Sequence, residues 1–518
     1  MKLASVSIKP SKVLEVLVLL RPNRNFRLPD ALARLSNSPR QHHETQALLR
    51  ESAAESGDIE AVRRFAAKHR LTALRVDLRT RTIVLGGPAR AMGVAFRVDI
   101  RIDRNGYRTH RKALAIPKEL AGLVIGVFGL DNRPVAKRPG RKSFPPKESL
   151  VPPPVTANTR PPKDFRKLYE FPRNATGKGQ SIGVLEFGGG FSQAKLRSYL
   201  GKLGVAAPRV KVREIPPGGN HPVNQPGTLS PDTEVYMDLE VLASVAPDAT
   251  LVVYFAENSS RGWIEALHAA IFDTKDRLSV LSISWGQAER SWDAQTIAAI
   301  EHALQMAALL GITVCCASGD RGVFESDAHP YSVPFPGSSA HVLACGGTRL
   351  DVLGGATRRE TVWNESRAAG VASGGGISSV FGLPAFQKDH DLPARHRERA
   401  KGRGIPDVAA NASATTGYLI WSDNTAMSLG GTSATAPLWA GLVACLNEGL
   451  GRRIGYLTPL LYTGKRNHGL RSISKGNNRL DGRQGYDARK GWDPCTGLGS
   501  PHGVKLLDWL KRRHGSRS

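Results

Sequence analysis

Hydrophobic residues in the last two thirds of the chain form short continuous runs. The runs cover Ile182–Phe187, Leu251–Phe255, Val280–Ile283, Ile312–Ala317 and Val342–Cys345. They alternate with segments whose apolar residues recur at helical spacing, over Ser192–Leu203, Trp263–Phe272 and Ala294–Leu310. Apolar runs without polar alternation are typical of strands that are buried on both faces. We therefore predict an α/β fold, a parallel sheet with helices on both faces.

The first third of the chain has a different pattern. Short strand-like runs surround a helical segment at Ile59–His69, and they lie at Val13–Leu20, Thr82–Leu85, Val94–Ile102 and Leu123–Leu130. Residues 132–162 then hold nine prolines and many lysines and arginines, which is typical of an extended, protease-accessible linker. We predict a small α+β domain over residues 1–131, a basic linker over 132–162 and a main domain over 163–518.

The net charge of the 518 residues is +27, and most of it lies near the N-terminus. The first 150 residues hold 30 Lys and Arg against 13 Asp and Glu. This excess suits an acidic partner, so a nucleic-acid-binding protein is one alternative. Only 6% of the residues are aromatic and no nucleic-acid-binding motif occurs, so we expect no nucleic-acid partner. The apolar run Val16–Leu20 is far shorter than the roughly 20 residues of a membrane span, and we expect no membrane segment and no signal peptide.

A glycine-rich turn leads into an apolar helix near residue 433. Residues 430–437 read Gly-Gly-Thr-Ser-Ala-Thr-Ala-Pro, and apolar residues at helical spacing follow. This places Ser433 at a helix N-terminus, where unpaired N–H groups favour developing negative charge. Ser433 is therefore a candidate nucleophile, and the alternative is a serine that only caps the helix.

A nucleophilic serine needs a base, and histidine is the usual one. None of the 14 histidines lies in a suitable motif, so carboxylates are the next candidates. Glu234 and Asp238 are spaced i, i+4 on one helical face that continues as Val241, Leu242 and Val245. Two acids held together in a dry site share a proton and raise each other's pKa. The alternative is a pair of solvated helix carboxylates.

Three further polar residues follow predicted core strands directly. They are Asp320 after Ile312–Ala317, Glu186 after Ile182–Leu185, and Trp285 after Ser282–Ser284. Chemistry in open parallel sheets gathers at the carboxyl ends of the strands. Taken alone, an aspartate at such a position is most often a turn residue that bonds its own backbone, so Asp320 gains weight only from the coincidence of several such positions.

These motifs together resemble the sedolisin family of serine-carboxyl peptidases, in particular its kumamolisin-type members. The resemblance rests on Glu234-x-x-x-Asp238 followed by Leu-Glu, on Ser318-Gly319-Asp320, and on Gly431-Thr432-Ser433 with Pro437, in that order along the chain. It implies a subtilisin-like peptidase domain preceded by an activation propeptide. The propeptide would act as an intramolecular inhibitor and be removed by self-processing in the linker.

The resemblance also implies roles for the residues. Ser433 corresponds to the nucleophile, Glu234 to the general base, Asp238 to its partner carboxylate, and Asp320 to the acid that donates a hydrogen bond to the oxyanion. Glu186 and Trp285 correspond to positions that support the network. A carboxylate base and a carboxylic acid donor predict activity at acidic pH.

A calcium ion near the C-terminus is the cofactor that the resemblance implies. Its expected ligands here are Asp493 and the carbonyls of Ile473 and Gly491, but Ser472 stands where another aspartate is expected. Positive charge is added nearby by Lys475, Arg489 and Lys490. Calcium prefers carboxylate ligands. Either calcium is held weakly, or a lysine or arginine pairs with Asp493 in its place, and we favour the second.

From the family we further expect an endopeptidase that cleaves proteins or peptides, is secreted and acts as a monomer. The rival is a catalytically silent binding protein on the same fold. A complete set of four catalytic residues argues against that rival.

Overall fold

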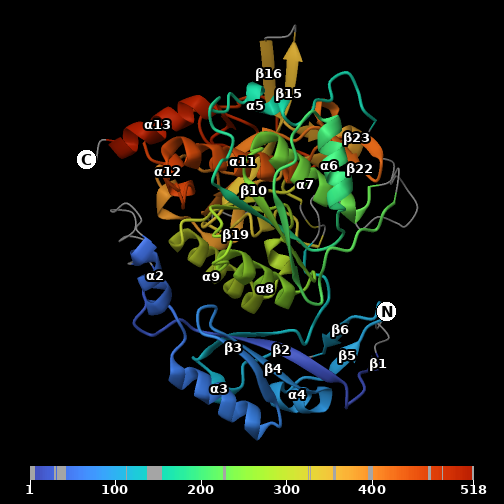
Figure 1. Cartoon of the computed structure of the whole chain (residues 1–518), viewed down its shortest axis with the longest axis vertical. Coiled ribbons are helices and arrows are strands. Elements are labelled where there is room, and N and C mark those ends of the chain that lie inside the picture. Colours follow the sequence, from blue (N-terminus) through green and yellow to red (C-terminus); the bar gives the residue numbers. More distant parts are fainter. Residues whose placement is uncertain are drawn as a thin grey trace. The chain divides into compact units, whose positions relative to one another are not determined.

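The computed structural model describes residues 6–28, 31, 42–111, 114–136, 154–225, 229–324, 326, 328–353, 357–394, 401–464, 468–480 and 482–515 (Figure 1). The chain divides into two compact units. The first unit combines Met1–Val135 with Glu257–Asp273 and Asp293–Leu310, and the second holds the remainder. Helices α8 (Ser260–Ile271) and α9 (Ala294–Leu309) therefore belong to the first unit. Most of the predicted linker lies outside the described residues, and the boundaries at 131 and 163 stay predictions.

An antiparallel sheet forms the centre of the first unit. Its strand order is β3 (Thr72–Asp77), β4 (Thr82–Pro88), β2 (Val13–Leu20) and β7 (Val124–Phe128). Helices α3 (Ser56–Lys68) and α4 (Ala89–Phe96) contribute Val62, Phe65, Met92 and Phe96 to the core beside the strand residues. The predicted strand Val13–Leu20 and the predicted helix near 59–69 are present.

The predicted strand Val94–Ile102 is wrong over most of its length. Residues up to Phe96 belong to α4, Arg97 ends that helix in a left-handed conformation, and β5 covers only Ile100–Ile102. Met92, Ala95 and Phe96 are buried at i, i+3 and i+4, while Val94 is exposed. A short apolar run is compatible with either a strand or a buried helix, and here packing against the sheet selects the helix.

A sheet of eight strands forms the centre of the second unit. The order is β16 (Thr357–Val362), β15 (Leu343–Leu353), β13 (Thr313–Ala317), β11 (Val280–Ile283), β8 (Ser181–Glu186), β10 (Thr250–Ala256) and β9 (Val210–Ile215), with β21 (Val408–Asn411) also paired to β15. All pairings are parallel except that of β15 with β16. The five predicted core strands are present in a parallel sheet.

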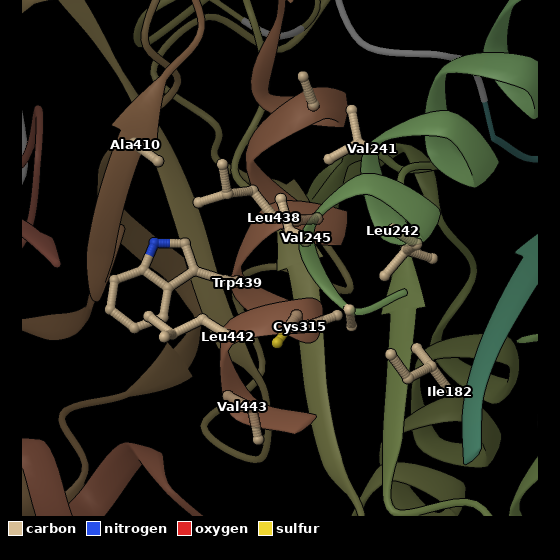
Figure 2. Packing of buried hydrophobic residues seen from close by; sticks show 14 of the residues in the cluster. Ile182, Val241, Leu242, Val245, Cys315, Ala410, Leu438, Trp439, Leu442 and Val443 are labelled. Carbon is tan, nitrogen blue, oxygen red and sulfur yellow. The ribbon is translucent and has the colours of Figure 1, made fainter. Parts of the chain in front are cut away.

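Two buried helices, α7 (Pro231–Val245) and α11 (Thr432–Leu450), pack against each other beside this sheet. Figure 2 shows Leu438 of α11 near Val245 of α7, and Val241 and Leu442 belong to the same hydrophobic core. A Cβ at Gly441 would lie 2.3 Å from Val245, so glycine permits this close approach. Every residue of α7 from Asp232 onward is buried, so the acids of α7 lie inside the protein whichever face they occupy. No helix among the described residues is long and apolar enough to cross a membrane.

Candidate active site

Ser433 is the second residue of α11 and is 3% exposed. The helix begins after Gly431, whose φ of 94° is a conformation that favours glycine. The Ser433 hydroxyl lies 3.4 Å from the carbonyl oxygen of Ser284, to which it donates a long hydrogen bond. The turn therefore presents a serine hydroxyl at the N-terminus of α11, where the N-cap residue Gly431 has no side chain.

Asp320 lies against the same turn, three residues after β13. Its Oδ1 accepts hydrogen bonds from the backbone N–H and from the hydroxyl of Thr432, each at 2.7 Å. Burial raises the pKa of Asp320 to about 6, although the two bonds from Thr432 act in the opposite direction. The charge of Glu234 also raises this pKa, so Glu234 acts on the same site. At mildly acidic pH Asp320 is a protonated hydrogen-bond donor.

The two acids of α7 that were predicted for the site occupy the interior of the second unit. Asp238 is fully buried and Glu234 is 8% exposed. Burial, and then the charges of Glu186 and Glu234, raise the pKa of Asp238 well above its ordinary value. The Ser284 hydroxyl lies 2.8 Å from Oδ2 of Asp238 and 3.2 Å from the carbonyl oxygen of Ser433. The Ser284 hydroxyl donates to the Asp238 carboxyl, and this bond partly opposes the rise in the pKa of Asp238.

Glu186 and Trp285 form the rear of the site. Glu186 is the last residue of β8 and is fully buried, and its Oε2 accepts a hydrogen bond of 3.0 Å from the indole N–H of Trp285. Trp285 is 6% exposed and follows β11 by two residues. An indole donor stabilises a buried carboxylate without adding a positive charge.

All six residues predicted for catalysis and its supporting network lie in the second unit, on neighbouring elements. Sequence reasoning did not single out Ser284 or Thr432 as functional residues. Both stand directly beside a predicted site residue, Ser284 before Trp285 and Thr432 before Ser433. A short hydroxyl side chain next to a catalytic position was the available signal.

Comparison with known proteins decides the family. The chain is 40% identical over 512 residues to kumamolisin from Bacillus sp. (strain MN-32), and the match covers 96% of this chain and 91% of that protein. The chain belongs to the sedolisin family of serine-carboxyl peptidases. Residues 221–486 match the subtilase family, and residues 5–133 match the pro-kumamolisin activation domain. This serine-carboxyl peptidase is therefore made as a zymogen with an N-terminal propeptide.

Other members of the sedolisin family support the same assignment. The chain is 28% identical over 493 residues to sedolisin from Pseudomonas sp. (strain 101), covering 89% of this chain and 80% of that protein. A solved structure of Pseudomonas sedolisin in complex with pseudo-iodotyrostatin matches with a TM-score of 0.61 and 29% identity, over 69% of this chain and 99% of that one. The predicted subtilisin-like fold is confirmed.

The segments predicted to bind calcium lie together, since the backbone N–H of Gly491 donates to the Ser472 hydroxyl at 3.3 Å. Asp493 is fully buried, and its Oδ1 accepts hydrogen bonds from the backbone N–H groups of Cys495 (2.8 Å) and Thr496 (2.9 Å). Among the described residues no group of three or more His, Cys, Asp and Glu side chains could hold a metal. One carboxylate already used by N–H donors does not fit a calcium site.

The predicted replacement of calcium by a charged side chain is wrong for Arg489. Its guanidinium pairs with Asp391 at 3.0 Å, and only its backbone N–H reaches Asp493, at 3.5 Å. Lys475 and Lys490 are exposed, whereas Asp493 is fully buried. Backbone and hydroxyl donors within residues 493–496 satisfy the Asp493 carboxyl because the loop closes on itself.

Proposed function

We propose that this peptidase is an acid-active endopeptidase that cleaves peptide bonds through an acyl-enzyme on Ser433. Glu234 takes the proton of the Ser433 hydroxyl as it attacks the substrate carbonyl, and later gives it to the leaving amine. Water then hydrolyses the ester bond. The observation that carries this proposal is that a helix-terminal serine adjoins a buried acid whose proton is retained at acidic pH.

Asp320 stabilises the oxyanion of the tetrahedral intermediate by donating a hydrogen bond from its carboxyl group. Its contact with Thr432, the residue before the nucleophile, supports this role. A single donor of this kind contributes on the order of 10²–10³ in rate. Above its pKa of about 6 Asp320 loses the donor proton, so activity falls as pH rises.

Asp238 is the carboxyl that shares a proton with Glu234. Glu186 and Trp285 support the positions of both acids. The fully buried Asp238 retains a proton more strongly than a solvated aspartate, because burial and two neighbouring carboxyls raise its pKa. A neutral Asp238 next to Glu234 lets one carboxylate carry the negative charge that a base requires. Activity should fall as pH rises above about 6, which favours an acidic compartment or secretion as the place of action.

Endopeptidase action is proposed over removal of tripeptides on the basis of similarity. The chain is 40% identical to kumamolisin but 27% identical, over 569 residues, to tripeptidyl-peptidase sed5 from Aspergillus fumigatus. A peptide with a blocked N-terminus separates the two activities. An endopeptidase cleaves it internally, whereas release of tripeptides from free N-termini alone contradicts this part of the proposal.

The central test is the dependence of kcat/KM on pH for the mature enzyme and for Asp320→Asn. We expect the wild type to lose activity about tenfold per pH unit above about 6. The amide of D320N has no proton to lose in this range, so its profile lacks that limb. A wild-type maximum at neutral or alkaline pH contradicts the proposal, and so does a D320N profile with the same alkaline limb. The full-length Ser433→Ala chain should stay uncut in residues 132–162 at acidic pH.

A further inference from the structure

Thr432 is fully buried and makes three hydrogen bonds around Asp320. Its hydroxyl oxygen accepts a bond of 3.1 Å from the backbone N–H of Gly319. Because that N–H is only a donor, the hydroxyl hydrogen must point elsewhere, and Oδ1 of Asp320 lies 2.7 Å away. The backbone N–H of Thr432 reaches the same Oδ1 at 2.7 Å. The direction of each hydrogen bond is therefore determined.

These bonds make the two oxygens of Asp320 different. A hydrogen on Oδ1 would be directed into two donors, so the carboxyl proton belongs on Oδ2. Oδ1 thus faces Thr432, whereas Oδ2 is the oxygen that faces Gly431 in the turn before the nucleophile. A Cβ placed on Gly431 would lie 2.8 Å from Oδ2 but 3.7 Å from Oδ1. The acidic hydrogen is thus presented at the turn that positions Ser433.

We propose that Thr432 is a positioning residue that holds the proton of Asp320 on Oδ2, the oxygen from which it is donated to the oxyanion. This inference rests on the proposed function of Asp320. Thr432 does not touch the reacting atoms in this account. It acts by occupying Oδ1 with two donors, so the proton has one location and one direction before the substrate carbonyl becomes negative.

The Thr432 hydroxyl has two effects, one on the pKa of Asp320 and one on the rate of the reaction. Its hydrogen bond favours the ionised carboxylate, so it lowers the pKa of Asp320 relative to burial alone. The same bond directs the proton and raises the rate. Loss of the hydroxyl should therefore lower the maximal rate and, at the same time, move the alkaline limb to higher pH. Misplacement of the helix would lower the rate without that upward movement.

The test compares mature Thr432→Val, Thr432→Ala and Thr432→Ser with the wild type. Each variant is processed by added wild-type enzyme, purified from it, and assayed for kcat and kcat/KM against pH on an internally quenched peptide. Val keeps the branched shape without the hydroxyl, and Ala provides a second variant without it. Thr435→Val is the matched control, since this buried hydroxyl in the same helix donates to the carbonyls of Cys345 and Thr432 and not to Asp320.

We expect T432V and T432A to lose about tenfold or more in kcat and to shift the alkaline midpoint upward by about half a pH unit or more. T432S should restore both values toward the wild type, and T435V should keep the wild-type midpoint. An unchanged or lowered midpoint in both T432V and T432A overturns the inference. If D320N removes the alkaline limb but these variants do not move it, the proposed function stands and the role of Thr432 fails. If D320N retains the limb, the proposed function itself fails.

Discussion

A buried histidine in the first unit predicts that acid weakens this unit. His268 on α8 is 6% exposed, and its ring contacts the Phe272 ring edge-on at 5.9 Å. Burial and then the charge of Arg81 lower its pKa from 6.5 to about 3, and Asp77 opposes them weakly. His302 on α9, also facing Arg81, has a pKa lowered well below its ordinary value by burial first. Arg81, just before β4, is 2% exposed.

The sign and the size of the effect follow from these values. A histidine whose pKa is lowered on folding stabilises the folded unit fully above pH 6.5, and this stability is lost as pH falls toward 3. One pKa unit corresponds to about 1.4 kcal/mol. Between pH 7 and pH 5 the first unit should therefore lose about 2 kcal/mol through His268 alone. Since this unit contains the propeptide, acidification favours its opening.

The perturbation is His268→Gln in the full-length S433A chain, which cannot process itself. Hydrogen exchange of the Val13–Leu20 peptide, corrected for intrinsic rates, measures the opening free energy of β2 at pH 7 and pH 5. Between pH 7 and pH 5 the opening free energy of β2 should fall by about 2 kcal/mol less in H268Q than in its parent. The corrected exchange rate should therefore rise about thirtyfold less in H268Q. His110→Gln, at a partly exposed position of the same unit, is the control and should behave as the parent. Equal losses in H268Q and the parent would refute the reasoning.

Three further predictions concern the second unit. Glu240 is fully buried, its Oε2 accepts the backbone N–H of Trp421 at 3.0 Å, and burial raises its pKa well above the ordinary value. The protonated Glu240 stabilises the fold fully at low pH, and this stabilisation is lost as pH rises above the ordinary pKa of a glutamate. The parent S433A chain should therefore lose unfolding free energy as pH rises, whereas Glu240→Gln in that chain should not. The difference in unfolding free energy, measured with urea, should grow by up to about 1.4 kcal/mol per pH unit. Equal slopes would contradict this. Gly431→Ala places a Cβ at a φ of 94° and 2.8 Å from Asp320, so it should lower kcat/KM at least about 100-fold. Gly451→Ala is the control, since that glycine also has a positive φ, 66°, but has open space around it, and this variant should keep its activity. Similar activity of the two variants would contradict the prediction. Chelator should leave the thermal midpoint unchanged, and a lowered midpoint restored by calcium would show that the residues around 493 bind it.

The two units should therefore respond to acid in opposite directions. The buried carboxyls of the second unit, Asp238 and Glu240, have raised pKa values, so the second unit is most stable at low pH, where both are protonated. Buried histidines of the first unit, His268 and His302, are accommodated as neutral rings and are most stable at higher pH. Acid thus favours the second unit over the first, which combines the propeptide with α8 and α9 of the peptidase sequence.

Much of this could be predicted from local pattern. Five continuous apolar runs correspond to parallel strands, because a strand that is buried on both faces has apolar residues at successive positions. Val94–Ile102 was predicted wrongly because its residues suit a buried helix equally well, and only packing against the first sheet selects between them. Arg489 was predicted wrongly because a charge near Asp493 in sequence turned toward Asp391 in space.

The sequence alone determined which residues are candidates for chemistry, because strand ends, helix starts and glycine turns are set by local spacing. Ser433, Glu234, Asp238 and Asp320 were candidates on those grounds, each with a structural alternative, and the resemblance to the sedolisin family decided between the two. Only the tertiary structure decided their protonation and orientation. The bond from Thr432 to Asp320 joins residues 112 positions apart, and Ser284 reaches the Ser433 carbonyl across 149. Burial and hydrogen bonding act through space, so the pKa of each acid and the oxygen that carries its proton depend on neighbours that sequence spacing does not reveal.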